Sequence, residues 1–237
     1  MKIKKKTIVL ISIIAILLLS IIVKLSTDFY KENKLKEEIK EIVRLINTNP
    51  ENNEKIDELL NRTVIKKGKY NIVETSLKKY YKELYSDYSN LLFIIDDENF
   101  TNYLSETSLR ENRPSFINTK NNIENTYNQI DALYTEVENE VKEISIKLPY
   151  ISEYNLSTYY KELYLSLIDD NLGAEFINNL EKEKNKAKDK LAIYEEAIQY
   201  LSTYNNEWSI KNGVIEFKDM SYKTEYEIIM NKLKEVE

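Results

Sequence analysis

The chain contains no cysteine and no histidine, and its 237 residues include only three glycines and three prolines. Without cysteine or histidine the sequence excludes disulfides, a thiol nucleophile, a Cys/His zinc site and a Ser-His-Asp triad. The glycines, Gly68, Gly173 and Gly213, lie too far apart to form a phosphate-binding loop of the GxGxxG or GxxxxGK[ST] type. We therefore expect no cofactor, no metal site and no catalytic residue, and we expect that the protein is not an enzyme.

A long apolar run is the most informative feature that the sequence does contain. Thr7 to Val23 reads TIVLISIIAILLLSIIV, 17 residues without a charge, and lysines flank it on both sides. At 1.5 Å per residue the run spans about 26 Å as a helix, slightly less than the hydrocarbon core, and flanking lysines can reach the headgroups. The run predicts a single transmembrane anchor over residues 7–23. A cleaved signal peptide is the alternative, and it is less favoured because no small-x-small cleavage site follows the run.

The lysines around the run predict its orientation. Four of the first six residues are lysines, whereas the basic residues after Lys24 are interspersed with Asp28, Glu32, Glu37 and Glu38. Positive residues are enriched on the cytoplasmic side of membrane proteins. We expect residues 1–6 to form a short cytoplasmic tail and the bulk of the chain to be extracellular at the cell membrane.

Net charge differs strongly between the anchor and the rest. Residues 1–24 carry five lysines and no acid, so the remaining residues carry 29 basic and 40 acidic groups, a formal net charge of −11. Such a surface repels polyanions, and we therefore expect no nucleic acid partner. Lysine greatly outnumbers arginine, and asparagine, isoleucine and tyrosine are abundant. This composition is typical of AT-rich coding, which indicates a low-GC bacterium.

Beyond the anchor, apolar residues recur at helical spacing. One segment lies between Pro114, which suits a first helical turn, and Pro149, which we expect to end the helix. A second runs from about Leu172 to Asn205. Both carry a seam with steps of three and four residues, made of Ile123, Tyr127, Ile130, Tyr134, Val137, Val141, Ile144 and Leu148 in the first and Leu180, Lys184, Ala187, Leu191, Tyr194, Ile198 and Leu201 in the second.

These seams predict an elongated antiparallel helical bundle over residues 25–205, because short breaks between helices favour antiparallel neighbours. A seam can also pair between chains, so a coiled-coil homo-oligomer remains the alternative. The sequence favours pairing within the chain.

Residues 206–237 predict a small β-hairpin and a final helix that pack on the bundle. The segment EWSIKNGVIEF alternates apolar and polar residues around Asn212-Gly213, a pair that suits a type I′ turn. With this turn the cross-strand pairs are Trp208 with Phe217 and Ile210 with Ile215. A solitary hairpin is marginal in water, so these four residues are expected to pack on the bundle.

Tyrosine is abundant, with 19 residues, and it clusters. The hexamer YYKELY occurs at Tyr80–Tyr85 and again at Tyr159–Tyr164, which indicates either convergent helix patterning or two related helices with matching faces. Tyrosine suits interfaces because a flat apolar ring carries a polar tip. The alternative is that these rings fill the borders of helices. The candidate interaction surface comprises Tyr80, Tyr81, Tyr85, Tyr88, Tyr159, Tyr160 and Tyr164.

Carboxylates are the remaining chemistry that a hydrolase would need in this chain, as glycosidases use two of them. The candidates are the acids of Asp96–Glu98 and the pair Asp169-Asp170. Their positions at helix junctions fit helix capping equally well. An envelope hydrolase is therefore the less favoured alternative.

Together these patterns predict a mainly α protein with an N-terminal transmembrane helix, a helical bundle, and a C-terminal hairpin and helix. We expect a non-catalytic binding or scaffolding module at the bacterial cell envelope, with an envelope protein as partner. A structural spacer or homo-oligomer is the alternative.

Overall fold

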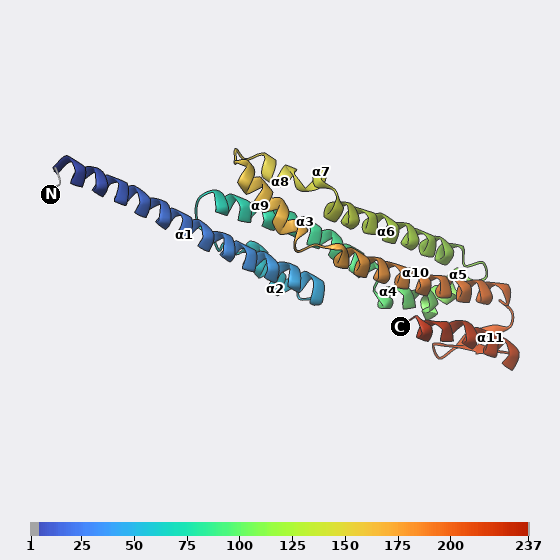
Figure 1. Cartoon of the computed structure of the whole chain (residues 1–237). Helices are drawn as coiled ribbons and strands as arrows, with labels where there is room; N and C mark the ends of the chain where they lie inside the picture. The colour runs from blue at the N-terminus through green and yellow to red at the C-terminus, as the bar shows by residue number, and fades with distance from the viewer. Residues whose placement is uncertain (1–4, 237) are drawn as a thin grey trace. The chain divides into compact units, whose positions relative to one another are not determined.

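The structure, a computed structural model, describes the backbone of residues 5–236 and the side chains of residues 13–236. Most of the predicted tail at residues 1–6 lies outside the described residues. The fold is mainly α, with a long N-terminal helix, a two-stranded antiparallel hairpin near the C-terminus and a helix after it, as the sequence predicts (Figure 1).

The chain folds into two compact units, and helix α3 contributes to both. Unit 1 comprises residues 1–82 and 147–172, and unit 2 comprises residues 83–146 and 173–237. Unit 1 contains α1 (Lys5–Thr48), α2 (Asn53–Asn61), the start of α3 (Lys69–Ile94), α8 (Pro149–Ser152) and α9 (Thr158–Asp169). Unit 2 contains the rest of α3, α4 (Asp97–Thr101), η1 (Asn102–Leu104), α5 (Glu106–Asn112), α6 (Ile117–Lys142), α10 (Ala174–Thr203), β1 (Trp208–Lys211), β2 (Val214–Phe217), α11 (Met220–Asn231) and η2 (Lys232–Glu235), while α7 (Ile144–Lys147) joins the units.

Helix α1 combines two different surfaces in one uninterrupted helix (Figure 1). Its large apolar side chains from Ile13 to Leu25 are between 48% and 64% exposed. From Leu35 to Ile46, in contrast, the stripe at helical spacing is buried in unit 1. By length and composition α1 can cross a membrane, and it is the one such helix in the described part of the chain.

The core of unit 1 forms where helices α1, α2, α3, α8 and α9 meet. Helix α1 contributes Leu35, Ile39 and Ile42, all fully buried, and α2 packs on it through Ile56 and Leu59. Helices α3, α8 and α9 supply further core residues: Val73, Leu77, Ile151, Leu163 and Ile168. The 3-4 spacing of apolar residues places them on one face of each helix, which explains why burial alternates along each helix.

In unit 2 the two predicted seams pack against each other in antiparallel order. Tyr127 of α6 donates a hydrogen bond to the carbonyl of Lys188 in α10, at 3.3 Å. Farther along α6, the ammonium of Lys184 lies 3.7 Å from the centre of the Tyr134 ring. Residue numbers therefore rise along α6 while they fall along α10. The apolar seams are buried within the chain, as Ile130, Val137, Leu191 and Ile198 illustrate.

The first seam is shorter than the sequence predicts. Helix α6 ends at Lys142, because Glu143 adopts an extended conformation with φ −88° and ψ 114°. Ile144 is consequently 56% exposed and does not belong to the seam. Pro149 occupies the first turn of α8 and so begins a helix, which is a position that proline tolerates well. Pro114 lies in the turn before α6 and not in its first turn.

The hairpin has the register that the sequence predicts. Trp208 pairs with Phe217 and Ile210 pairs with Ile215. Asn212 and Gly213 both have positive φ, 53° and 77°, as a type I′ turn requires. The hairpin and α11 pack beside α10, where Ile193, Ala197 and Ile229 form a buried cluster with partly buried apolar neighbours.

Candidate functional site

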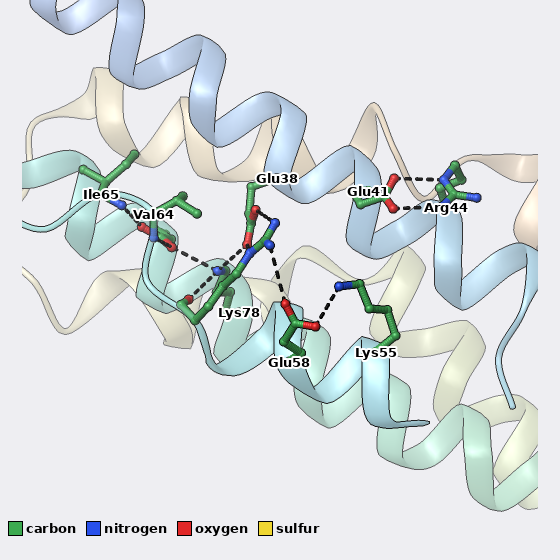
Figure 2. Close-up of polar contacts among 10 residues, drawn as sticks. Glu38, Glu41, Arg44, Lys55, Glu58, Val64, Ile65 and Lys78 are labelled. Carbon is green, nitrogen blue, oxygen red and sulfur yellow. Dashed lines mark hydrogen bonds and ion pairs between the residues drawn. The ribbon is translucent and has the colours of Figure 1, made fainter. Parts of the chain in front are cut away.

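Four charged residues form a mostly buried ion cluster in unit 1: Glu38 of α1, Arg62, and Glu74 and Lys78 of α3. Lys78 donates to the Glu38 carboxylate at 2.8 Å and to the Arg62 carbonyl at 2.6 Å. Its ammonium also lies 3.0 Å from Glu74. Arg62 binds Glu38 through two nitrogens, at 2.9 and 2.5 Å. Figure 2 shows Lys78 between Glu38 on α1 and the backbone of Val64 and Ile65.

Burial makes this ion cluster structurally important. The side chains of Glu38, Glu74 and Lys78 are at most 7% exposed, whereas Arg62 is 43% exposed. Glu74 accepts backbone hydrogen bonds from Val64 and Ile65, both at 2.8 Å, so its lone pairs are satisfied. Burial alone raises the pKa of Glu38, but hydrogen bonds and charge from Arg62 and Lys78 outweigh it and lower that pKa overall. The cluster ties α1, the segment after α2 and α3 together.

Part of the interaction surface that the sequence predicts from tyrosines is buried in the structure. Tyr80, Tyr81, Tyr85 and Tyr164 are buried, with 0% to 7% exposure. Their rings fill space between helices, and the Tyr81 hydroxyl donates to the Leu167 carbonyl at 3.2 Å. These four residues therefore belong to the core and not to a surface. The remaining members are Tyr88 and Tyr160, which are half-buried, and Tyr159, which is exposed.

The two YYKELY segments lie on adjacent helices but at different heights. Helices α3 and α9 contact each other through Tyr81 and Leu167, and through Tyr70 and Tyr160. The second copy, at Tyr159–Tyr164, begins beside Tyr70, which precedes the first copy by ten residues. The matching faces are thus not paired with each other.

A second cluster, the tyrosine cluster, consists of Tyr70, Tyr159 and Tyr160 in unit 1. The Tyr70 and Tyr159 hydroxyls lie 3.2 Å apart, and Tyr159 donates to the Glu32 carboxylate at 2.5 Å. Tyr160 makes edge contacts with both other rings, each at 5.1 Å between centroids. Hydrogen bonding to Glu32 and Tyr70 raises the pKa of Tyr159. The pKa of Glu32 is lowered, first by Lys36 and then by Tyr159. The tyrosine cluster therefore joins α9 and α3 to α1.

Three of the five acids that the sequence suggests for hydrolysis, Asp96, Asp97 and Asp169, have structural partners. Asp96 caps α4 by accepting the amide of Glu98 at 3.0 Å. Asp97 forms an ion pair with Lys190 at 2.5 Å in unit 2. In unit 1, Asp169 forms an ion pair with Lys147 at 2.6 Å. Capping was the competing interpretation of these positions, and for Asp96 it is the observed one.

One carboxylate pair in unit 2 is electrostatically unusual. Glu140 of α6 is 9% exposed and shares a hydrogen bond with Asp87 of α3. Burial, the negative charge of Asp87 and the hydrogen bond to it raise the pKa of Glu140 to about 8, and Glu136 and Glu83 add to the effect. A proton shared between two carboxyl groups satisfies such a pair near neutral pH. The pair can therefore hold or release a proton.

The hairpin supplies the remaining surface of interest. Trp208 is 2% exposed, stacks on Phe116 at 6.2 Å and donates from Nε1 to the Leu201 carbonyl at 2.8 Å. The Trp208 ring is therefore buried within unit 2. Ile210, Ile215 and Phe217 are half-buried. A groove of about 700 Å³ runs beside β2, lined by Leu104, Gly213, Val214, Ile215, Glu216, Phe217, Lys223, Tyr226 and Glu227.

Within residues 13–236, no group of acidic side chains has the arrangement needed to hold a metal ion. No known protein family, characterised protein or solved structure is significantly similar to the chain.

Sequence patterns did not indicate the ion cluster or the Asp87–Glu140 pair. Glu38 and Lys78 stand next to apolar stripe residues, Ile39 and Leu77. A charged residue beside a stripe is usually solvated, so its position alone carries little information. The sequence contains only a weak indication of the ion cluster: Glu74 and Lys78 have the i,i+4 spacing of an ion pair.

Proposed function

We propose that the protein is a single-pass, membrane-anchored binding or scaffolding module with its bulk outside the cell. One observation supports this most directly: α1 is exposed and apolar from Ile13 to Leu25, and then buried in unit 1 from Leu35. In water, such an exposed apolar helix is unfavourable, whereas a bilayer accommodates it. The ion cluster then fixes the same helix to the folded part, so the anchor and the module are mechanically continuous.

The non-catalytic part of the proposal is supported by the roles of the acids. Asp96 caps a helix, and Asp97 and Asp169 form ion pairs with Lys190 and Lys147. Hydrolysis by paired carboxylates needs one group to give a proton and another to attack or activate water. Groups engaged with caps and lysines are poorly suited to either task.

Anchoring is tested by extracting membranes of expressing cells with alkaline carbonate. We expect the full chain to stay in the pellet. The double variant Ile16→Lys/Leu17→Lys places two charges in the apolar run, each costing about 2.5–3.5 kcal/mol at the centre of a span, and we expect it to be released. The control Asn33→Lys/Asn47→Lys adds two lysines at exposed positions of α1 beyond the run and should remain in the pellet. Release of the unmodified chain would contradict the proposal.

Orientation is tested by adding protease to intact cells. If most of the chain is extracellular, the protease should digest its C-terminal part without cell lysis. Protection of the whole chain until lysis would instead place the bulk in the cytoplasm.

For the binding role we propose the groove beside β2 as the partner-facing surface, because Val214 is 62% exposed there and the groove is partly apolar. Val214→Glu places a charge in the groove without disturbing buried residues. Lys211 is its cross-strand partner and is also exposed. A protein partner that co-purifies in fixed ratio with the wild type and with Lys211→Glu, but not with Val214→Glu, would support the role. Equal recovery with both variants would reject the groove.

The alternative of a homo-oligomer held by the seams is less favoured, because α6 and α10 bury their seams against each other within unit 2. Sedimentation of the detergent-solubilised chain distinguishes the two, since a monomer excludes the alternative.

A further inference from the structure

The start of α3 lies at the end of unit 1 that is nearest to the apolar run of α1. The contacts between α1, α3 and α9 show this. Along α1, Glu32 contacts Tyr159 and Glu38 contacts Lys78. Tyr70, which contacts Tyr159, precedes Lys78 on α3. Residue numbers thus rise together along α1 and α3, and the start of α3 lies toward the apolar run.

The segment between α2 and α3 returns toward the apolar run. Arg62, at the end of α2, binds Glu38, whereas Tyr70 at the start of α3 lies at the level of Glu32. The intervening residues Lys66, Lys67 and Lys69 are exposed. Figure 1 shows this loop turning back beside α1 before α3 begins. The three lysines therefore lie at the end of unit 1 nearest the span.

This end lies close to where a bilayer surface would be. Glu32 follows Val23 by nine residues, which is about 13 Å along a helix. Phe29 and Tyr30 lie in between and are 68% and 65% exposed. Aromatic side chains of this kind are enriched at membrane interfaces. Since the Debye length at physiological salt is about 8 Å, charges just beyond the headgroups still interact with them.

The end of unit 1 that is nearest to the span has a positive net charge, whereas the chain after the apolar run is negative as a whole. We define the membrane-facing end as residues 24–36, 63–70 and 153–161, which carry eight basic and three acidic side chains. One of the acids, Glu32, is already engaged by Lys36 and Tyr159. The chain after the anchor is strongly acidic as a whole. The positive charge of this end therefore suits an anionic partner at the bilayer surface.

We propose that the membrane-facing end of unit 1 binds the headgroups of anionic lipids. Lys66, Lys67 and Lys69 contact lipid phosphates, and Phe29 and Tyr30 insert at the interface. The tyrosine cluster holds the starts of α3 and α9 on α1, which keeps the lysines at the level of the headgroups. The contact would hold unit 1 close to the bilayer surface. The proposal rests on the membrane anchoring proposed above and goes beyond it by naming the lipid chemistry.

The experiment uses the full chain reconstituted in lipid nanodiscs. Because the chain has no cysteine, Ser157→Cys gives a unique fluorophore site at an exposed position next to the tyrosine cluster. Glu51→Cys gives a reference site in the turn between α1 and α2, at the opposite end of α2 from Arg62. A quencher attached to lipid headgroups reports the proximity of each site to the bilayer surface.

We expect severalfold stronger quenching at Ser157→Cys in discs containing anionic lipid than in neutral discs, and little quenching at Glu51→Cys in either. The added variant Lys66→Gln/Lys67→Gln/Lys69→Gln should reduce the signal to its neutral-disc level. The matched control Lys40→Gln/Lys79→Gln/Lys82→Gln removes three exposed lysines elsewhere in unit 1 and should keep it. Salt near 1 M, where the Debye length is about 3 Å, should reduce it.

Four results would overturn the inference. Equal quenching in neutral and anionic discs, or no loss in the Lys66/Lys67/Lys69 variant, would reject anionic lipid binding while leaving the anchor intact. Loss of the signal on adding inorganic phosphate, at an ionic strength where chloride has no effect, would indicate a site for a soluble anion. Failure of the chain to enter discs of any composition would reject the anchoring and, with it, this inference.

Discussion

The carboxylate of Glu38 lies 2.8 Å from the ammonium of Lys78, and both side chains are at most 7% exposed. Glu38 is on the helix that continues into the apolar run, and Lys78 is on α3. This pair therefore fixes the position of α1 along α3 in unit 1. Apolar side chains on the same helices supply burial, but an ion pair is satisfied in only one register.

We predict that Lys78→Met strongly destabilises unit 1. Without the ammonium, Glu38 and Glu74 remain buried with too little compensation. Breaking a buried pair by removing one partner costs about 3–5 kcal/mol. Thermal unfolding followed by circular dichroism in detergent measures the loss. Lys82→Met, an exposed position on the same helix, should change stability by less than about 0.5 kcal/mol. Equal effects in the two variants would show that the ion cluster is not structurally important.

We predict that unit 2 loses stability as the pH rises, because the folded state favours protonated Glu140. Its pKa is raised from 4.5 to about 8. The stabilising contribution is therefore complete below about pH 4.5 and is lost as the pH rises through 8. Above pH 8 we expect a loss on the order of 1–3 kcal/mol in the free energy of unfolding.

Glu140→Gln should remove this pH dependence, since the amide keeps the shape without a titrating proton. Glu124→Gln, at an exposed position of the same helix, should retain it. Denaturant unfolding at several pH values from about 4 to 9 gives the comparison, because both pKa values lie within this range. A wild-type chain with constant stability over this range would contradict the raised pKa.

We predict that Gly213→Ala destabilises the hairpin. The φ of Gly213 is +77°, a region that costs residues with a Cβ about 1–2 kcal/mol. Steric contact contributes little, because the nearest atom to an added Cβ would be Glu106 Oε2 at 3.6 Å. Gly173→Ala is the control, since its φ is −83° and its surroundings are open. Amide exchange of the hairpin should increase in the first variant only.

We predict that Arg113→Leu weakens the packing of the hairpin on the rest of unit 2. The Arg113 guanidinium lies 4.0 Å from the centre of the Trp208 ring and donates to Asn205 Oδ1 at 2.8 Å. Loss of both contacts should cost about 1–3 kcal/mol. Trp208 is the one tryptophan in the chain, so its emission should shift to longer wavelength as the ring becomes more exposed.

Arg44→Leu is the control for this prediction, because the exposed Arg44 pairs with Glu41 in unit 1 and the hairpin belongs to unit 2. An exposed pair contributes at most about 1 kcal/mol. An unchanged emission spectrum in Arg113→Leu would show that the hairpin does not depend on this contact.

Much of the fold follows from the sequence because it depends on local patterns. The charge-free run, the seams and the Asn212-Gly213 turn each predict one element from its own residues, and α1, α6, α10 and the hairpin confirm them. The end of α6 at Lys142 was not predictable, since Ile144 continues the seam spacing although it is exposed in the structure.

The candidate site depended on contacts between distant residues. Composition and spacing determined that the chain is mainly helical, has one apolar run long enough to span a membrane, and lacks thiol and imidazole chemistry. Only the tertiary structure decided that Tyr80, Tyr81, Tyr85 and Tyr164 are core residues and that Glu38 meets Lys78. The reason is physical: periodicity tells which face of a helix is apolar, whereas the packing of helices decides which residues at its border are enclosed.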